Sequence, residues 1–325
     1  MAASSARAPR ALLLTAGLGT RLRPLTYARA KPAVPVNGTP LVRRILTWLA
    51  GYGVDNVVLN LHYRPETIAA ITGDGSDLGL RIRYSWEQPV LGSAGGPRHA
   101  LPLLTDGRDD PFLLVNGDTL TDVDLPALQA AHAASGAQVT MALVPNERPE
   151  HYGGVLVSED GFVTGFTRRG ASQPSFHFVG VQVAGPGVFA PLEDHVPAES
   201  VGRLYPTLMA ANPRSVGAFI CSATFRDIGT AADYLETSLA FADAEGDRMA
   251  RGARQTIADS AAILRTALWD DVTIGRHARL TDCIVCDGVQ VPDGAAYERC
   301  SLALPHDGAL EAGERLDGGL LVRPF

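Results

Sequence analysis

The segment Thr15–Pro32, TAGLGTRLRPLTYARAKP, carries four cationic side chains and no carboxylate. Its last cation, Lys31, is the single lysine among the 28 lysines and arginines of the chain. A guanidinium is a planar fork that binds phosphate oxygens in pairs, whereas an ammonium is a compact point charge. The residue types therefore predict that Arg21 grips a phosphate group and that Lys31 acts at a more crowded phosphorus centre.

A glycine-rich turn precedes these cations. Gly17 and Gly19 follow the apolar run ALLL, and backbone N–H groups in such a turn can approach a phosphate closely. The dinucleotide-binding fingerprint needs a third glycine where Leu22 stands, and no Gly-Lys-Ser or Gly-Lys-Thr sequence follows to form a Walker loop. The turn therefore predicts a phosphate-binding loop of another kind.

Residues 12–42, LLLTAGLGTRLRPLTYARAKPAVPVNGTPLV, resemble the signature AGGxGTRLxPLTxxxPKPxxP of the sugar-1-phosphate nucleotidyltransferases, the NDP-sugar pyrophosphorylases. The resemblance covers residues 10 to about 245. It implies transfer of a nucleotidyl group from a nucleoside triphosphate to a sugar 1-phosphate, with release of pyrophosphate. Further landmarks of the family follow in order: EQPVLGSAGG (87–96), VNGDTL (115–120), YGGV (152–155), FVGV (178–181) and FRDIGT (225–230).

The resemblance gives particular residues a role. Arg21 and Lys31 are the expected catalytic residues, acting by alignment and charge neutralisation. Asp118 and Asp227 are the expected ligands of Mg²⁺, a metal that prefers one or two carboxylates beside substrate phosphates. Glu87 is expected to select guanine by accepting from its N1–H and amino groups. The expected nucleotide-binding residues are Leu14, Ala16, Gly17, Gly19, Thr20, Glu87, Gly92 and Asp118.

The expected sugar-phosphate site consists of Gly153, Arg169 and Val181. The family has Glu-Lys-Pro where this chain has Arg168-Arg169-Gly170. We expect Arg169 to replace the lysine that grips the sugar phosphate. The carboxylate that binds the sugar hydroxyls is lost at Arg168, so the identity of the sugar stays open.

Apolar runs alternate with amphipathic stretches through the first half of the chain. This pattern predicts a Rossmann-like, mostly parallel sheet with helices on both faces, and ligands at the carboxyl ends of the strands. Asp122 and Asp124 are expected to be turn and helix-cap residues. Strands are expected at 11–16, 56–61, 81–86, 112–117 and 138–144, and helices at 41–52 with Thr39 as cap, 65–72, 125–135 and 231–244.

The predicted domains are a catalytic domain at 1–245, a linker at 246–256 and a β tail at 257–325. In the tail, Val272, Ala278 and Ile284 recur at near six-residue spacing, which resembles the hexapeptide repeat of a left-handed β-helix with two or three turns. The period slips after Ile284, so an irregular β tail is the alternative. Such a tail is too short for acyltransferase chemistry and is expected to support a homo-oligomer.

Cysteine and histidine residues raise the question of a second metal. Cys283, Cys286, Cys300 and His306 have the residue types of a zinc site, but thiols buried in β-helix rungs explain the cysteines better. The eight histidines show no metal-binding spacing along the chain.

Composition and charge restrict the number of domains, the partners and the location that we expect. A chain of 325 residues with 46% hydrophobic and 19% charged residues suits one large domain and a smaller one. The net charge of −7 argues against nucleic acid as a partner. No apolar run reaches the length of a membrane span or of a signal peptide's core, so we expect no membrane partner and a cytoplasmic location.

Within the family, AGLGTRLRPLT together with LGSAGG is most similar to the bacterial mannose-1-phosphate guanylyltransferases. We therefore expect GTP and mannose 1-phosphate as substrates. The alternatives are a uridylyl- or thymidylyltransferase acting on glucose, muramic or heptose phosphates, and a non-catalytic subunit that senses nucleotide sugars. Retention of Arg21, Lys31, Asp118 and Asp227 argues against the sensor.

Overall fold

The computed structural model describes residues 8–247 and 249–325 and divides into two compact units. Unit 1 holds the described residues up to Gly17, Ile45–Pro65 and Thr72–Phe225. Unit 2 holds Leu18–Arg44, Glu66–Ile71 and Arg226–Phe325. This division differs from the boundaries predicted at 245 and 257, because most of the signature segment belongs with the tail. The N-terminal residues 1–7, on which part of the targeting prediction rests, lie outside the described residues.

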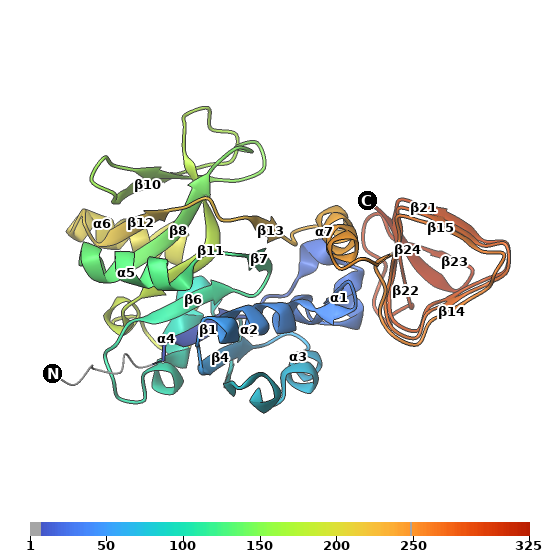
Figure 1. The fold of residues 1–325 in the computed structure, drawn as a ribbon, viewed down its shortest axis with the longest axis horizontal. Coiled ribbons are helices and arrows are strands. Elements are labelled where there is room, and N and C mark those ends of the chain that lie inside the picture. The colour runs from blue at the N-terminus through green and yellow to red at the C-terminus, as the bar shows by residue number, and fades with distance from the viewer. Residues whose placement is uncertain (1–7, 248) are drawn as a thin grey trace. The chain divides into compact units, whose positions relative to one another are not determined.

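A nine-stranded mixed sheet, counted over the described residues, forms the centre of unit 1 (Figure 1). Its path runs β10-β9-β11-β6-β1-β4-β5, with β8 beside β11 and β12 beside β8. The strands are β1 (Arg10–Leu14), β4 (Asn56–Leu61), β5 (Arg81–Trp86), β6 (Phe112–Asn116), β8 (Val139–Pro145), β9 (Gly154–Val157), β10 (Val163–Thr167), β11 (Phe176–Ala184) and β12 (Val216–Ile220).

Four of these strands are parallel and form the half of the sheet that the sequence predicted. β1 pairs with β4 and β6, and β4 pairs with β5. Leu14 lies opposite Asn60 in one neighbour and opposite Asn116 in the other. This register brings the carboxyl ends of β1, β4 and β6 to one edge of the sheet. Beyond these strands the sheet is mixed, because β11 is antiparallel to β6 and β8.

Three predicted helices are confirmed residue for residue: Pro65–Thr72, Leu125–Ser135 and Ala231–Ala244. The fourth predicted helix forms as α2 (Leu41–Gly51), but Thr39, its predicted cap, lies instead with Pro40 in the short strand β3. This strand is antiparallel to β2 (Pro35–Val36). In the described residues, no helix is long and apolar enough to cross a membrane. The α-helices are α1 (Leu25–Ala28), α2 (Leu41–Gly51), α3 (Pro65–Thr72), α4 (Gly92–Thr105), α5 (Leu125–Ser135), α6 (Tyr205–Ala211) and α7 (Ala231–Ala244).

Helix α4 was not expected, because its sequence GSAGGPRHALPLLT contains two prolines and three glycines. It packs against β1, β4 and β5. An added side-chain carbon at Gly95 would lie only 2.7 Å from the carbonyl oxygen of Val196. Tertiary contact with small residues therefore stabilises this helix against its poor intrinsic propensity.

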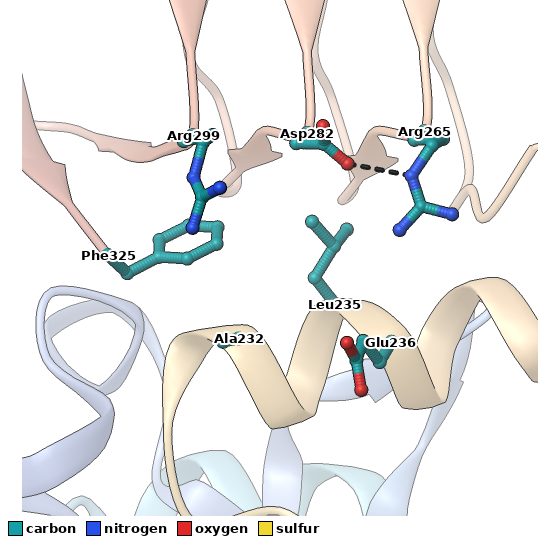
Figure 2. A pocket seen from close by; sticks show the side chains of 7 residues that line it. All are labelled: Ala232, Leu235, Glu236, Arg265, Asp282, Arg299 and Phe325. Carbon is teal, nitrogen blue, oxygen red and sulfur yellow. Dashed lines mark hydrogen bonds and ion pairs between the residues drawn. The ribbon is translucent and has the colours of Figure 1, made fainter.

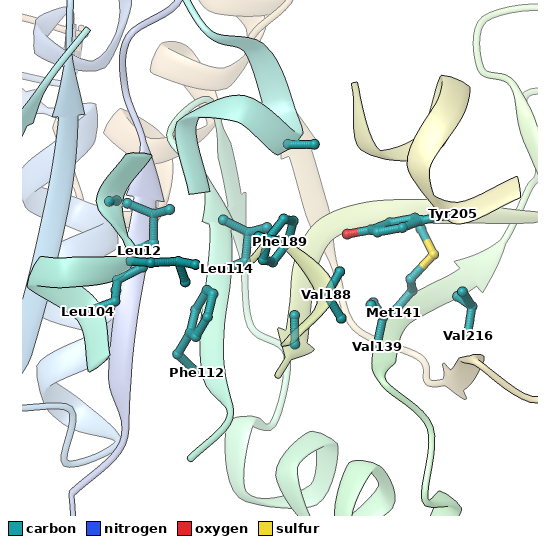
Figure 3. Packing of buried hydrophobic residues seen from close by; sticks show 14 of the residues in the cluster. Leu12, Leu104, Phe112, Leu114, Val139, Met141, Val188, Phe189, Tyr205 and Val216 are labelled. Atoms are coloured by element: carbon teal, nitrogen blue, oxygen red, sulfur yellow. The ribbon is translucent and has the colours of Figure 1, made fainter. Parts of the chain in front are cut away.

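The apolar core of unit 1 lies between this sheet and its helices (Figure 3). Leu12, Phe112 and Met141 of three strands are buried there together with Tyr205 of α6. The Tyr205 hydroxyl donates a 2.9 Å hydrogen bond to Oε1 of Gln182, and burial raises the pKa of this phenol. A buried hydroxyl needs such a partner, since leaving it unpaired costs about 1–3 kcal/mol.

The tail in unit 2 is a parallel β-helix of three coils within the described residues. Its three faces are β14 (Thr256–Ile257), β17 (Thr273–Ile274) and β20 (Gln290–Val291), then β15 (Ala262–Leu264), β18 (Arg279–Thr281) and β21 (Ala296–Glu298), then β16 (Ala267–Leu268), β19 (Ile284–Val285) and β22 (Cys300–Ala303). Strands β24 (Leu320–Pro324) and β23 (Arg315–Asp317) extend the third face in antiparallel fashion.

Each coil of the tail takes 17 residues, as the pairings of Thr256 with Thr273 and of Ala262 with Arg279 record. Successive strands begin at residues 256, 262, 267 and 273, so one side of the coil is a residue shorter than the others. This short side is the reason that the six-residue period slips.

Helix α7 packs against one row of corners of the β-helix. Arg265, Asp282 and Arg299 occupy this row on successive coils and project toward Leu235 and Glu236 of the helix (Figure 2). Nε of Arg265 donates to Oδ1 of Asp282 at 2.8 Å. The pocket that they line has a volume of about 230 Å³, and none of the predicted site residues lines it.

Candidate active site

The predicted nucleotide loop begins at the carboxyl end of β1 in unit 1. The Thr15 amide donates to Oδ1 of Asn60 at 2.6 Å, and the Thr15 hydroxyl donates to the Asn60 carbonyl oxygen. The Gly117 amide donates to the Leu14 carbonyl oxygen at 2.9 Å. Ala16, buried, and Gly17, exposed, follow directly. The structure thus brings the loop after β1 beside the turn that carries Asp118.

Glu87 is a buried residue with an internal role. Its Oε1 accepts from Nδ2 of Asn60 at 2.7 Å, and its Oε2 accepts from the Leu91 amide at 2.8 Å. The residue is only 4% exposed. The two bonds hold Glu87 between the strand that carries Asn60 and the loop that carries Leu91. Its predicted contact with guanine stays a prediction.

The sequence did not predict two contacts of Glu87, one with Asn60 and one with Gly96. Asn60 is a buried asparagine near the end of β4, among apolar neighbours, which was the available signal for a polar link. Gly96 of α4 lies against the pair, because an added side-chain carbon there would sit 2.6 Å from Oε1 of Glu87 and 2.9 Å from Nδ2 of Asn60. Gly92 begins the same helix at a φ of +76°. The EQPVLGSAGG landmark is therefore a packing unit around one carboxylate.

Asp118 lies half-buried in the tight turn between β6 and β7 (Thr119–Thr121). Glycine is required before it, since a side-chain carbon at Gly117 would sit only 2.4 Å from the Leu14 carbonyl oxygen. Of the roles predicted for the next two aspartates, the helix cap at Asp124 is confirmed, whereas Asp122 binds Thr224, 102 residues further along the chain, instead of closing a local turn. Asp122 accepts from the Thr224 amide at 2.7 Å, and Asp124 caps α5 by accepting from the Ala127 amide at 3.0 Å.

The cations of the signature lie in unit 2. Gly19, at a φ of +62°, precedes the 3₁₀ turn η1 (Thr20–Leu22), which contains the exposed Arg21. Lys31 begins a second 3₁₀ turn, η2 (Lys31–Ala33), and is half-buried. A side-chain carbon at Gly19 would meet Cγ2 of Thr26 at 2.8 Å and Cβ of Lys31 at 3.3 Å. The turn therefore folds back so that Gly19 lies against Lys31.

Asp227 and Arg21 lie around the same glycine in unit 2. Asp227 ends β13 (Phe225–Asp227), and a side-chain carbon at Gly229 would lie 3.2 Å from Oδ2 of Asp227 and 3.6 Å from Nη1 of Arg21. Thr230 then caps α7 in a reciprocal capping box with Asp233. The FRDIGT landmark thus places a carboxylate, a glycine and a helix start beside a predicted catalytic cation.

The residues predicted for the sugar phosphate fall on two structures in unit 1. Gly153 and Arg169 flank the antiparallel pair β9–β10, in which Gly154 lies opposite Thr167. Arg169 is exposed in a turn, where Gly170, at a φ of +83°, donates its amide to the Pro149 carbonyl oxygen at 2.7 Å. Val181 lies in β11 and is 1% exposed, so its side chain belongs to the packed interior.

An aromatic cluster in unit 1 was not anticipated. The His177 ring lies with its centroid 4.2 Å from that of Tyr152 and 4.6 Å from that of Phe225. Burial lowers the pKa of His177 to about 4, and its Nδ1 atom has no hydrogen-bond partner among the described residues. The imidazole is therefore neutral at physiological pH and packs as an aromatic ring.

The thiol prediction is confirmed. Cys283 and Cys300 are buried on successive coils with their Sγ atoms 3.9 Å apart, and burial raises the pKa of the neighbouring Cys286.

The fold brings together one cluster of potential metal ligands that sequence spacing did not reveal. His99, Asp194 and His195 have potential ligand atoms within 4.8 Å of one another, and they are the only such set of three among the described residues. Nδ1 of His99 hydrogen-bonds to Oδ1 of Asp194 at 2.8 Å.

Comparison with known proteins places the chain in a family. Residues 10–244 match the model for nucleotidyl transferases, and the chain belongs to this family. The match begins with β1 and ends with α7. It therefore includes every predicted site residue described above.

Particular relatives have named activities. The mannose-1-phosphate guanylyltransferase of Mycobacterium tuberculosis is 32% identical over 301 residues, which cover 89% of this chain and 83% of that protein. A UTP–glucose-1-phosphate uridylyltransferase of Synechocystis is 30% identical over 218 residues, which cover 62% of this chain and 55% of that protein.

Among solved structures, HddC from Yersinia pseudotuberculosis, complexed with GMP-PN, matches with a TM-score of 0.60 and 21% identity. The match covers 72% of this chain and 99% of that one. This likeness confirms the predicted nucleotidyltransferase fold.

Proposed function

We propose that this protein transfers the guanylyl group of GTP to mannose 1-phosphate, giving GDP-mannose and pyrophosphate. The observation that carries the proposal is the 32% identity, along 89% of the chain, with a mannose-1-phosphate guanylyltransferase. An oxygen of the sugar phosphate forms a bond to the α-phosphorus of GTP. The bond from that phosphorus to the bridging oxygen of the leaving β-phosphate breaks, and the electron pair leaves with pyrophosphate.

The chemistry needs alignment and neutralisation of crowded negative charge rather than a protein nucleophile. Arg21 is the proposed partner of the leaving phosphates, because its exposed guanidinium can bind two oxygens at once. Lys31 is the proposed partner of the reacting α-phosphate. Its half-buried position supports this role, since the base of the side chain, at Cβ, is held against the Gly19 turn.

We propose Mg²⁺ as the cofactor, with Asp118 and Asp227 as its protein ligands. Both side chains are half-buried carboxylates, Asp118 in a tight turn and Asp227 at the end of β13, and carboxylate oxygens are the donors that Mg²⁺ prefers. When bound, the ion would neutralise phosphate charge.

In this proposal, the nucleotide and the sugar phosphate bind to different parts of unit 1. Backbone groups of residues 14–17, together with the start of α4 at Gly92, receive the nucleotide. Glu87 links these loops through its hydrogen bonds to Asn60, which binds the Thr15 amide, and to the Leu91 amide. Arg169 binds the sugar phosphate, with Gly153 on the same hairpin leaving room for the sugar.

A uridylyltransferase is the second candidate, because a UTP–glucose-1-phosphate uridylyltransferase is 30% identical over 62% of the chain. That match covers less of this chain than the guanylyltransferase match does. A nucleotide-sugar sensor is disfavoured, since Arg21 and Asp227 are retained and lie together around Gly229.

The test is a pyrophosphate-release screen of GTP, UTP, dTTP and ATP against mannose, glucose and other sugar 1-phosphates with Mg²⁺. We expect the highest kcat/KM for GTP with mannose 1-phosphate, and a greatly reduced but measurable kcat in Lys31→Ala. Faster use of UTP or dTTP would replace the guanylyltransferase with the second candidate. Light scattering tests the tail-mediated homo-oligomer, which stays a prediction, as does the cytoplasmic location.

A further inference from the structure

Several side chains of the signature segment bind the C-terminal tail within unit 2. Arg23 forms an ion pair with Glu311. Tyr27 packs on His306 with the two ring centroids 4.2 Å apart. A third and more elaborate contact belongs to Arg29. Along the sequence, the three residues that make these contacts lie between Arg21 and Lys31, the two cations proposed for catalysis.

Arg29 binds two aspartates of the β-helix at once. Its Nε and Nη2 atoms donate to the two carboxylate oxygens of Asp287 at 2.6 and 2.7 Å, and Nη2 also donates to Asp270 at 2.7 Å. The guanidinium carbon lies 5.6 Å from the centroid of the Trp269 ring. The Arg29 side chain is 16% exposed. A partly buried fork on a carboxylate is stronger and better oriented than a surface ion pair.

The partners of Arg29 are themselves held by the β-helix. Oδ1 of Asp287 accepts from the Asp270 amide at 3.1 Å, and Oδ1 of Asp270 accepts from the Ala253 amide at 2.7 Å. Trp269 is fully buried. Both carboxylates that bind Arg29 are therefore themselves held by backbone amides of the β-helix.

Trp269 of the tail is also linked, through Tyr234, to Pro35, which follows the η2 turn. Nε1 of Trp269 donates to the Tyr234 hydroxyl at 2.7 Å, and that hydroxyl donates to the Pro35 carbonyl oxygen at 2.5 Å. Lys31 thus lies between two anchored positions, Arg29 and Pro35. Only Ala30, which is fully buried, separates Arg29 from Lys31.

We propose that Arg29 is a positioning residue for the transfer reaction and that the β-helix tail sets the position of Lys31 through the Arg29–Asp287–Asp270 clamp. The inference rests on the proposed function and adds to it, because it makes the tail part of the catalytic apparatus as well as the predicted oligomerisation module. A displacement of about 1 Å in a charged group that contacts the reacting phosphate can cost on the order of 10²-fold in rate.

The test compares Arg29→Ala with Arg254→Ala in the full-length protein. Arg254 is the matched control, because it binds both oxygens of Asp271 at 2.6 and 2.7 Å on the same β-helix, and its side chain is 65% exposed. We expect Arg29→Ala to lower kcat about 10- to 100-fold with KM for GTP changed less than about threefold. Arg254→Ala should leave both unchanged.

A double-mutant cycle separates positioning from a loss of fold. If Arg29 acts through Lys31, Arg29→Ala combined with Lys31→Ala should have the same kcat as Lys31→Ala alone. Losses that multiply would overturn the proposal, as would a normal kcat for Arg29→Ala. Asp287→Asn is the second variant. It keeps the shape of the partner and should produce a smaller loss of the same kind if Arg29→Ala fails to fold.

Amide hydrogen exchange gives a readout that needs no activity. Residues 30–36 should exchange about 10-fold faster in Arg29→Ala than in the wild-type protein or in Arg254→Ala. Equal exchange in the three proteins would overturn the clamp. A wild-type chain that is inactive with every substrate overturns the proposed function instead, and the exchange measurement then still decides whether the tail holds the segment around Lys31.

Discussion

Asn60, at the end of β4, donates a 2.7 Å hydrogen bond to Oε1 of Glu87, which directly follows β5. The same side chain accepts from the Thr15 amide at 2.6 Å. One buried amide therefore joins the loop after β1 to the loop after β5. The nucleotide loop of the signature and the EQPVLGSAGG landmark are held as one structure, although they are far apart in the chain.

Replacement of Glu87 by glutamine should destabilise the protein. The new amide nitrogen cannot accept a hydrogen bond, so either Asn60 or the Leu91 amide loses its partner, at a cost of about 1–3 kcal/mol in the free energy of unfolding. Urea denaturation measures this cost, and Glu159→Gln, at an exposed position, is the control. We expect kcat/KM to fall alike for GTP and UTP. A change in the GTP-to-UTP ratio with stability intact would instead support the predicted contact between Glu87 and the base.

Asp118→Asn or Asp227→Asn should nearly abolish turnover, with partial recovery at raised Mg²⁺. Each change removes an ionic ligand from the proposed metal, while the amide keeps the shape of the side chain. Asp124→Asn is the matched control, because asparagine caps a helix as well as aspartate does. Steady-state rates over a Mg²⁺ series decide the matter. Full activity of either variant without added metal would remove both ligands from the assignment.

Lys31→Arg should keep the fold and the binding of GTP but lose most of kcat. A guanidinium is broader than an ammonium and prefers a planar fork, whereas the reacting phosphorus presents oxygens of two substrates in a small volume. The loss of a contact made mainly in the transition state should cost about 3–4 kcal/mol, or on the order of 10²–10³ in rate. Kinetics of Lys31→Arg beside Lys31→Ala provide the measurement. Wild-type kcat in the arginine variant would make the single lysine an accident of composition.

Arg169→Ala should raise KM for the sugar 1-phosphate much more than KM for GTP. The residue is exposed in the turn that follows β10, where it can approach an anionic ligand from solvent. Arg168→Ala is the control, since its side chain lies in the same turn with the same charge. Equal changes of the two KM values for Arg169→Ala would show that Arg169 is a surface charge without a ligand.

Acid should destabilise the protein through His177. Its pKa is about 4 in the folded protein because the ring is buried, and it is 6.5 without that burial. The unfolded chain therefore binds the proton more readily, so His177 costs no stability above about pH 6.5 and up to about 3 kcal/mol as pH falls to about 4. His177→Leu should flatten the stability profile across this window, whereas His151→Leu, at an exposed position, should not. Parallel profiles of His177→Leu and the wild-type protein would contradict this origin.

The elements that sequence reading located correctly are those with a strong local signal. Asn56–Leu61 and Arg81–Trp86 form strands as expected, and Leu125–Ser135 forms a helix that its aspartate cap predicted. Hydrophobic periodicity and capping act over a few residues, so they can be read without the fold. Helix α4 lacks both signals, because its glycines and prolines disfavour a helix until the neighbouring segments surround it.

The sequence by itself determined the family, the parallel half of the sheet, a β-helix-like tail of two or three turns and the cations of the signature, because each of these is written in residue types and short spacings. Only the tertiary structure decided which partners those residues have. Asn60 meets Glu87 across 27 residues, and Arg29 meets Asp287 across 258 residues. The distance between two such side chains depends on the register of whole strands and on a coil of 17 residues, not on any local pattern. The fold therefore showed Glu87 as a buried link between loops, and it tied the signature segment to the tail.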